Sequence, residues 1–288
     1  MQKLRVLYFG TPDFSAEFLN KILENKEIPI KIDEVVTQED KKVGRNQIIA
    51  QSPVKILAIK KSIKVLHDFP NEKYDLGLVF SYGKIIPKKI LDLFKYGVWV
   101  VHPSILPKYK GPSPVAQALI DGEKETGVSL IIADEGVDTG DIISIKKLHI
   151  NPSEKRNELT NRLVSIAYDL FIESINKFIQ NNNNVVGIKQ EKGDFPITKK
   201  FDKQDGFIPF EELNKAQSDN AIRIYNIFRG LYPWPGVWTK VKINRVERRL
   251  KITDMELVSG RLIIKRVQLE GKKEVDFKTF NIAYKIFI

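Results

Sequence analysis

The chain contains no cysteine, which excludes disulfides, thiolate nucleophiles and cysteine-ligated metal sites. Its three histidines, His67, His102 and His149, lie far apart without the spacing of metal ligands, so we expect no metal. No apolar run approaches the roughly 20 residues that a transmembrane helix needs. The apolar stretch near the N-terminus lacks a small-residue cleavage site and predicts a first strand, not a signal peptide. We therefore expect a cytoplasmic protein without membrane contact.

The charge is unevenly distributed along the chain. The net charge is +11, and residues 206–288 contribute much of it, with 16 Lys and Arg against 9 Asp and Glu. A basic module favours a polyanionic partner, of which nucleic acid is the commonest. The alternative is a general richness in lysine that has no binding role.

Two structural patterns follow one another along the 288 residues. In the first part, apolar runs alternate with helical spacing, which predicts an α/β fold with a doubly wound parallel sheet. Near the end, short apolar runs at roughly barrel spacing predict a small all-β barrel like the oligonucleotide-binding fold. We predict a first domain over 1–184, a linker over 185–205 and a barrel domain over 206–288. The expected strands are 4–9, 32–37, 75–80, 98–101, 128–132, 237–243, 250–257, 261–268 and 284–288, and the longest expected helix is 154–180.

Two titratable residues each follow an apolar run. His102 comes directly after 98–101, and Asp138 lies in the acidic loop after 128–132. Because the carboxyl ends of parallel strands meet at one edge of a sheet, we expect the two side chains to lie close together. The alternative is a structural histidine and a solvated acidic turn.

Such a pair has a definite chemistry. A histidine beside a carboxylate can donate to a developing oxyanion, and the carboxylate can accept a proton through water. The sequence contains neither a G-x-G-x-x-G dinucleotide motif nor a G-x-S-x-G nucleophile elbow. The pattern therefore favours acyl or one-carbon transfer without a covalent enzyme intermediate.

A series of short motifs runs in order along nearly the whole chain. They are Gly10-Thr11-Pro12-Asp13-Phe14, Val36-Thr37-Gln38 with Asp40 and Gly44-Arg45, Ser52-Pro53-Val54-Lys55, Tyr82-Gly83 with Pro87, His102 with Ser104, Leu106-Pro107 and Gly111, Thr126-Gly127-Val128, Asp138-Thr139-Gly140-Asp141, Arg229-Gly230-Leu231 and Pro233-Trp234-Pro235-Gly236. This set resembles the methionyl-tRNA formyltransferase family, whose core is shared with glycinamide ribonucleotide and sugar-amine formyltransferases. The first motif, Gly44-Arg45 and the last motif favour the tRNA branch.

The resemblance implies a Rossmann-like domain that binds 10-formyltetrahydrofolate, followed by a barrel that binds tRNA, in a monomeric protein. The formyl group would pass to the α-amine of methionine on initiator tRNA. His102 and Asp138 match the family's catalytic residues, and Arg45 matches an arginine that meets the acceptor end of tRNA. The resemblance further places Tyr82, Ser104 and the 133–138 loop, with Gly136, among the substrate-binding residues.

One position departs from the family pattern. The family has an asparagine two residues before the catalytic histidine, where this chain has Val100. An asparagine amide can donate to the formyl oxygen, whereas valine cannot, and loss of one oxyanion donor typically costs about 10²–10³ in rate.

Three explanations of Val100 remain open from the sequence. Ser104 or Tyr82 supplies the missing donor, or the enzyme is attenuated, or the resemblance holds for fold and binding but not for catalysis. Two other functions stay as alternatives: a sugar-nucleotide amine formyltransferase, and a tRNA-binding homologue in which catalysis has lapsed.

Overall fold

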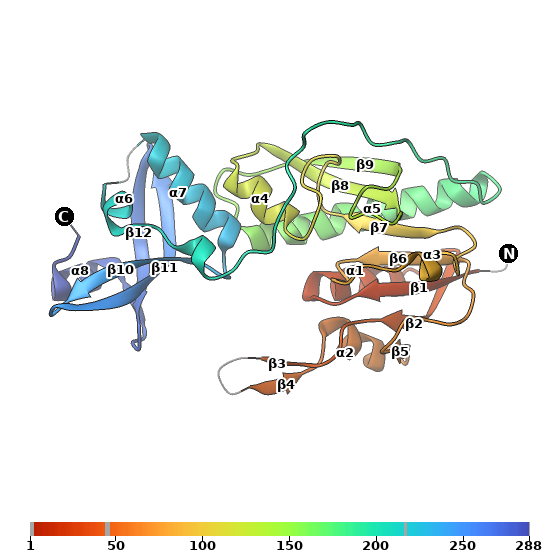
Figure 1. Ribbon diagram of the computed structural model, residues 1–288, viewed down its shortest axis with the longest axis horizontal. Coiled ribbons are helices and arrows are strands. Elements are labelled where there is room, and N and C mark those ends of the chain that lie inside the picture. Colours follow the sequence, from red (N-terminus) through yellow and green to blue (C-terminus); the bar gives the residue numbers. More distant parts are fainter. Residues whose placement is uncertain (1–2, 44–46, 216–217, 288) are drawn as a thin grey trace. The chain divides into compact units, whose positions relative to one another are not determined.

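The structure is a computed structural model that describes residues 3–43, 47–215 and 218–287 (Figure 1). The chain divides into two compact units. The first contains residues 1–112, 126–148 and 160–197, and the second contains residues 113–125, 149–159 and 198–288. The domain boundaries drawn from the sequence, near 184 and 206, stay predictions.

A seven-stranded sheet forms the centre of the first unit, in the order β5-β2-β1-β6-β7-β8-β9. The strands β2, β1, β6 and β7 pair in parallel, which confirms the predicted parallel sheet for this part. The short strand β5, which the sequence did not predict, pairs in parallel with β2. The elements are β1 (Leu4–Gly10), α1 (Asp13–Glu24), β2 (Ile30–Val36), β3 (Lys41–Val43), β4 (Ile48–Ala50), α2 (Pro53–Lys60), β5 (Lys64–Leu66), β6 (Leu76–Phe80), α3 (Lys88–Leu91), β7 (Val98–His102), β8 (Glu125–Ile132), β9 (Ile142–His149) and α5 (Arg156–Gln180).

The direction of β8 differs from the expectation. β8 runs antiparallel to β7, so that Trp99 pairs with Ile132 and His102 pairs with Ser129. The end of β8 therefore lies beside the start of β7, not beside His102. An apolar run specifies a buried strand but not its direction, because the alternation of side chains is the same in either sense.

Helices cover both faces of the central strands, as their continuous apolar runs require. On one face, Phe18 of α1 and Phe171 of α5 pack together, and Phe171 also meets Trp99 of β7. On the other face, Leu7, Phe9, Val79 and Val98 belong to a second buried cluster, which we call the α3-side cluster. Its other buried members are Val36, Tyr74, Tyr82, Ile90 and Phe94.

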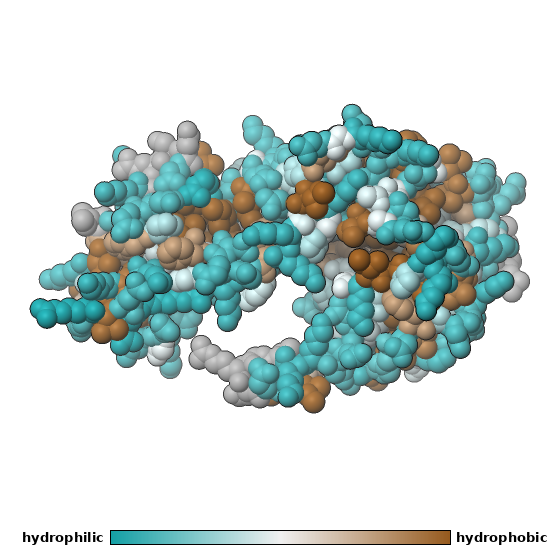
Figure 2. Space-filling view, viewed as in Figure 1, coloured by the Kyte–Doolittle hydropathy of each residue, from teal (hydrophilic) through white to brown (hydrophobic). Residues whose placement is uncertain are grey.

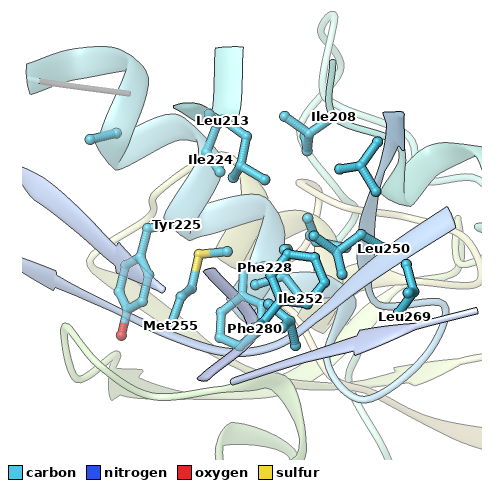
Figure 3. Close-up of a cluster of buried hydrophobic side chains, with 14 residues drawn as sticks. Ile208, Leu213, Ile224, Tyr225, Phe228, Leu250, Ile252, Met255, Leu269 and Phe280 are labelled. Carbon is cyan, nitrogen blue, oxygen red and sulfur yellow. The ribbon is translucent and has the colours of Figure 1, made fainter. Parts of the chain in front are cut away.

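The second unit contains a four-stranded antiparallel sheet in the order β10-β11-β12-β13. Buried side chains of α7 and the sheet form its core (Figure 3). The predicted strand at 284–288 is wrong: residues 277–284 form helix α8, which Asp276 caps by accepting from Thr279 N. The elements are α4 (Pro114–Ile120), η1 (Gln204–Gly206), α6 (Phe210–Asn214), α7 (Ser218–Leu231), β10 (Val237–Ile243), β11 (Val246–Val258), β12 (Arg261–Leu269), β13 (Glu274–Asp276) and α8 (Phe277–Tyr284).

The Arg229-Gly230 motif has a structural role in this unit. The Arg229 guanidinium is buried, which lowers its pKa, and it donates to the carbonyls of Asn151 and Glu154. A Cβ at Gly230 would lie 2.7 Å from the carbonyl oxygen of Ala116, so the close approach of α7 to α4 requires glycine. Among the described residues, no helix is both long enough and apolar enough to cross a membrane.

Replacing Phe171 with alanine tests the packing between α5 and the sheet. Phe171 is fully buried, so we expect Phe171→Ala to lower the free energy of unfolding by about 3–5 kcal/mol. Urea unfolding followed by circular dichroism measures the change. Ile59→Ala, on the exposed side of α2, is the control and should cost well under about 1 kcal/mol. Similar costs for the two variants would contradict this account of the core.

Candidate active site

His102 lies at the end of β7 and is almost completely buried. Its Nε2 atom is 2.9 Å from the carbonyl oxygen of Tyr109. A carbonyl can only accept, so Nε2 must carry a hydrogen and the other nitrogen, Nδ1, is the one that can exchange a proton. Nδ1 lies 3.4 Å from Asp138 Oδ2. The structure therefore brings together the two residues that the sequence singled out.

Asp138 reaches this position through the loop that joins β8 to β9. Both ends of the loop lie near the start of β7, because Ile132 N donates to Asp141 O and Ala133 N donates to Val98 O. His102 lies four residues further along β7 than Val98, roughly 13 Å of strand. The middle of the loop must therefore run back toward the end of β7 to bring the Asp138 carboxylate to the histidine.

The backbone at Asp138 has an uncommon conformation. Its φ is 54°, in the left-handed region that non-glycine residues rarely adopt. Its Oδ2 accepts from Gly111 N at 2.8 Å, so one backbone donor fixes the carboxylate oxygen that faces His102. A residue held in this region costs on the order of 1–3 kcal/mol and persists only where its surroundings enforce it.

Interactions within the loop restrict it further. Asp134 Oδ1 accepts from Gly136 N at 3.0 Å and from the Thr139 hydroxyl at 2.6 Å. A Cβ at Gly136 would lie 2.0 Å from Thr139 Oγ1, so this turn requires glycine. Gly136 thus shapes the loop, and its role in substrate binding stays a prediction.

Val100 lies two residues before His102 on the same strand, and so its side chain points to the same face of the sheet. It pairs with Val79 of β6 and Ile131 of β8. The side chain is half-buried and packs against the α3-side cluster, as Ile86 and Ala133 do. The face that carries His102 is therefore apolar at position 100.

Ser104 and Tyr82 are the two residues that the sequence offered as replacement donors. Ser104 is fully buried, and its hydroxyl donates to Lys108 O at 2.7 Å, within the turn after β7. The ring of Tyr82 packs against Phe9, and burial raises the pKa of the Tyr82 phenol. The Ser104 hydroxyl is occupied by its own turn, and the Tyr82 ring belongs to the α3-side cluster.

Strands β3 and β4 pair as a two-stranded hairpin. Gly44 and Arg45, which follow β3 in the sequence, lie outside the described residues. The base of the hairpin is closed by Lys55, whose ammonium contacts both carboxylate oxygens of Asp40 at 2.9 Å. A second closure is the 2.6 Å hydrogen bond between the hydroxyls of Thr37 and Ser52.

Two large hydrophobic side chains are exposed on the segments that follow β6 and β8. Ile85, after β6, and Val137, beside Asp138, are 69% and 51% exposed. Figure 2 shows a mostly hydrophilic face on which hydrophobic residues gather in small patches.

Comparison with known proteins assigns the family. The family model described as formyl transferase matches residues 2–175. A methionyl-tRNA formyltransferase of Caldicellulosiruptor saccharolyticus is 33% identical, over 98% of this chain and 97% of its own length. That of Dictyoglomus thermophilum is also 33% identical, over 99% and 98%. The chain belongs to the methionyl-tRNA formyltransferase family.

Solved structures agree with this fold. A methionyl-tRNA formyltransferase from Clostridium thermocellum superimposes with a TM-score of 0.59 at 20% identity, covering 92% of this chain and 98% of its own. A sugar 3N-formyl transferase, solved in the presence of dTDP and 5-N-formyl-THF, gives 0.65 at 20% identity, covering 96% and 97%. At these identities the likeness concerns the fold alone. Membership of the family makes the chain a formyl-transfer enzyme.

For this formyltransferase, sequence reasoning missed three contributors to the site. They are the backbone of Gly111, the carbonyl of Tyr109 and the side chain of Gln190, whose Nε2 donates to Asp138 O. Gly111 stood in a recognised motif, but nothing in its neighbours indicated that its amide meets Asp138. Gln190 lies in the segment predicted as a linker and carries no local signal.

The hydrogen-bonding of His102 predicts which tautomer this formyltransferase adopts. In the neutral ring, the hydrogen should reside on Nε2, because Tyr109 O accepts from it. Nitrogen-15 chemical shifts of histidine-labelled protein measure the tautomer, and a His102→Gln variant identifies the signal. A neutral ring with its hydrogen on Nδ1 would contradict this geometry.

Proposed function

We propose that this protein transfers a formyl group from 10-formyltetrahydrofolate to the α-amine of methionine on initiator Met-tRNA, in translation initiation. The observation that carries the proposal is the His102–Asp138 pair, with 3.4 Å between Nδ1 and Oδ2. The full-length similarity to methionyl-tRNA formyltransferases supports the choice of substrate.

The two residues would act on protons while the amine attacks the formyl carbon. The attacking amine nitrogen would lose a proton, and Asp138 or His102 Nδ1 is placed to accept it, directly or through one water. The bond from the formyl carbon to the folate nitrogen would break, and that nitrogen would take up the proton. The oxyanion that forms needs a donor. In this geometry His102 Nε2 donates to Tyr109 O, so the ring must release that carbonyl if it is to serve the oxyanion.

The residues around the pair fit the folate co-substrate. Val100, Ile86 and Ala133 add an apolar surface to the α3-side cluster on the face that carries His102. A pterin ring is flat and largely apolar on its faces, and Ile85 and Val137 offer exposed apolar contacts. When bound, the folate supplies the activated formyl group, and this chain's residues orient it and manage protons.

Charge supports tRNA as the second substrate. Residues 206–288 hold 16 Lys and Arg against 9 Asp and Glu. Two basic residues lie at neighbouring positions of the antiparallel sheet. Arg248 of β11 pairs with Val241 of β10, and Lys242 of β10 pairs with Glu247 of β11. Exposed Lys and Arg side chains favour contacts with phosphates, and the affinity from such contacts falls as the salt concentration rises.

A sugar-nucleotide amine formyltransferase is the alternative enzyme. This chain has a fold similar to that of a sugar 3N-formyl transferase, which is the reason to test this reaction. Full-length sequence similarity and the basic second unit favour the tRNA substrate instead. A competition assay between Met-tRNA and a dTDP-amino sugar separates the two reactions.

Asp138→Asn tests the role of the carboxylate. Asparagine keeps the shape and can still accept from Gly111 N, but it removes the charge beside His102. We expect kcat for formyl transfer to fall by about 10²–10⁴, as for loss of a general base, with little change in tRNA affinity. Filter binding with labelled tRNA provides the affinity. Activity equal to that of the parent would overturn the assignment of Asp138.

Val100→Asn tests whether the valine limits the rate. If position 100 faces the formyl oxygen, the amide adds a donor, and transfer of labelled formyl to Met-tRNA should rise about 10²-fold or more. Val100→Ala is the control, because it changes the volume without adding a donor. A fast parent enzyme, with no gain in Val100→Asn, would mean that another group serves the oxyanion. No activity in either protein would favour the lapsed tRNA-binding homologue.

A further inference from the structure

The side chain of Gln190 contacts the loop that joins β8 to β9 at two points. Its side-chain nitrogen, Nε2, lies 2.8 Å from Asp138 O and 2.8 Å from Gly140 O. These are the backbone carbonyls on either side of Thr139, within the turn that presents the Asp138 carboxylate. A single amide group therefore spans the part of the loop whose backbone is left-handed.

The orientation of this amide follows from its neighbours. Both contacts are carbonyl oxygens, which only accept, so the NH₂ group must face them and use its two hydrogens. The other end, Oε1, is buried and has no hydrogen-bond partner among the described residues. The Gln190 amide thus makes both hydrogen bonds to the loop carbonyls while its own oxygen makes none among the described residues.

The backbone around Gln190 is hydrogen-bonded to the start of β9, which belongs to the first unit as Gln190 does. Ile188 and Ile142 exchange two backbone hydrogen bonds of 2.8 Å, at the start of β9. A Cβ at Gly187 would lie 2.6 Å from the Cβ of Asp141, so the segment passes close to the end of the loop.

The same segment also reaches the histidine side of the site. Six residues after Gln190, Pro196 O accepts from Tyr109 N at 2.8 Å, and Tyr109 O is the partner of His102 Nε2. Lys110 and Ile197 form an isolated bridge beside it. Residues 187–197 therefore contact the backbone that holds each member of the His102–Asp138 pair.

We propose that Gln190 is a positioning residue, which holds the Asp138 turn in its left-handed conformation and so keeps the carboxylate beside His102. The inference rests on the proposed function for its kinetic test. It also has a test that does not depend on catalysis. Asp138 Oδ2 accepts from Gly111 N, so hydrogen exchange at the Gly111 amide reports whether the carboxylate is in place.

Gln190→Met is the variant that tests the proposal, because it keeps the length of the side chain and removes both donors. We expect the Gly111 amide to lose protection from exchange. Since a displacement of about 1 Å can cost about 10²-fold, kcat should fall by about 10- to 100-fold while KM for tRNA stays within about twofold. Gln117→Met, which loses a surface hydrogen bond to Asp121, is the matched control and should change none of these quantities.

A double-mutant cycle shows whether Gln190 acts through Asp138. Adding Gln190→Met to Asp138→Asn should cost no more than about twofold, because the carboxylate that Gln190 positions is already gone. The same fold loss in both backgrounds would overturn the proposal, as would an unchanged Gly111 amide in Gln190→Met. If Gln190→Met does not fold, Gln190→Glu serves instead, since its ionised carboxylate cannot donate to the two carbonyls.

The outcomes separate this proposal from the proposed function. A parent protein that transfers no formyl group, with Gly111 protection lost in Gln190→Met, refutes the function and supports the positioning role. An active parent whose kcat and Gly111 protection are unaffected by Gln190→Met refutes the positioning role and leaves the function in place.

Discussion

The antiparallel course of β8 beside β7 is the constraint on which the site depends. It places the end of β8 at the start of β7, away from His102. The loop after β8 must then run back to bring Asp138 to the histidine. A parallel β8 would have delivered Asp138 to the carboxyl edge directly. The actual arrangement makes the position of the carboxylate a property of a loop, and loops hold a side chain in place only when other groups restrict them.

Three separate segments provide that restriction. Asp134 closes the loop from within, Gly111 donates to the carboxylate, and Gln190 donates to the backbone carbonyls of Asp138 and Gly140. The two donors from outside the loop, Gly111 and Gln190, lie far from each other and from the loop in the sequence. Together they stabilise a left-handed aspartate that would be costly by itself. Asp138 is thus held beside His102 by a backbone amide, the Asp134 carboxylate and the neutral amide of Gln190.

The strand that carries His102 is positioned by hydrophobic packing on both of its faces. Trp99 packs against α5 on one face, while Val98 and Val100 meet the α3-side cluster on the other. Valine suits such a strand because β-branched side chains pack well on a half-buried pleated surface. An asparagine at position 100 would give up part of that packing in exchange for a polar group beside the histidine. Val100 therefore favours the packing of the strand and places no polar side chain at this position.

Continuous apolar runs separated by helical spacing predicted the parallel strands β2, β1, β6 and β7, because such a pattern has few other solutions, whereas the short β5 carried no such signal. The sequence by itself also singled out His102 and Asp138, and its ordered motifs led to the family. The tertiary structure alone decided the direction of β8, the helix in place of a strand near the C-terminus and the use of the Ser104 hydroxyl by its own turn. It alone brought Gln190 to the Asp138 loop. The physical reason is that strand direction and long-range hydrogen bonds depend on which segments meet in space, whereas periodicity and local spacing record only how a segment is buried.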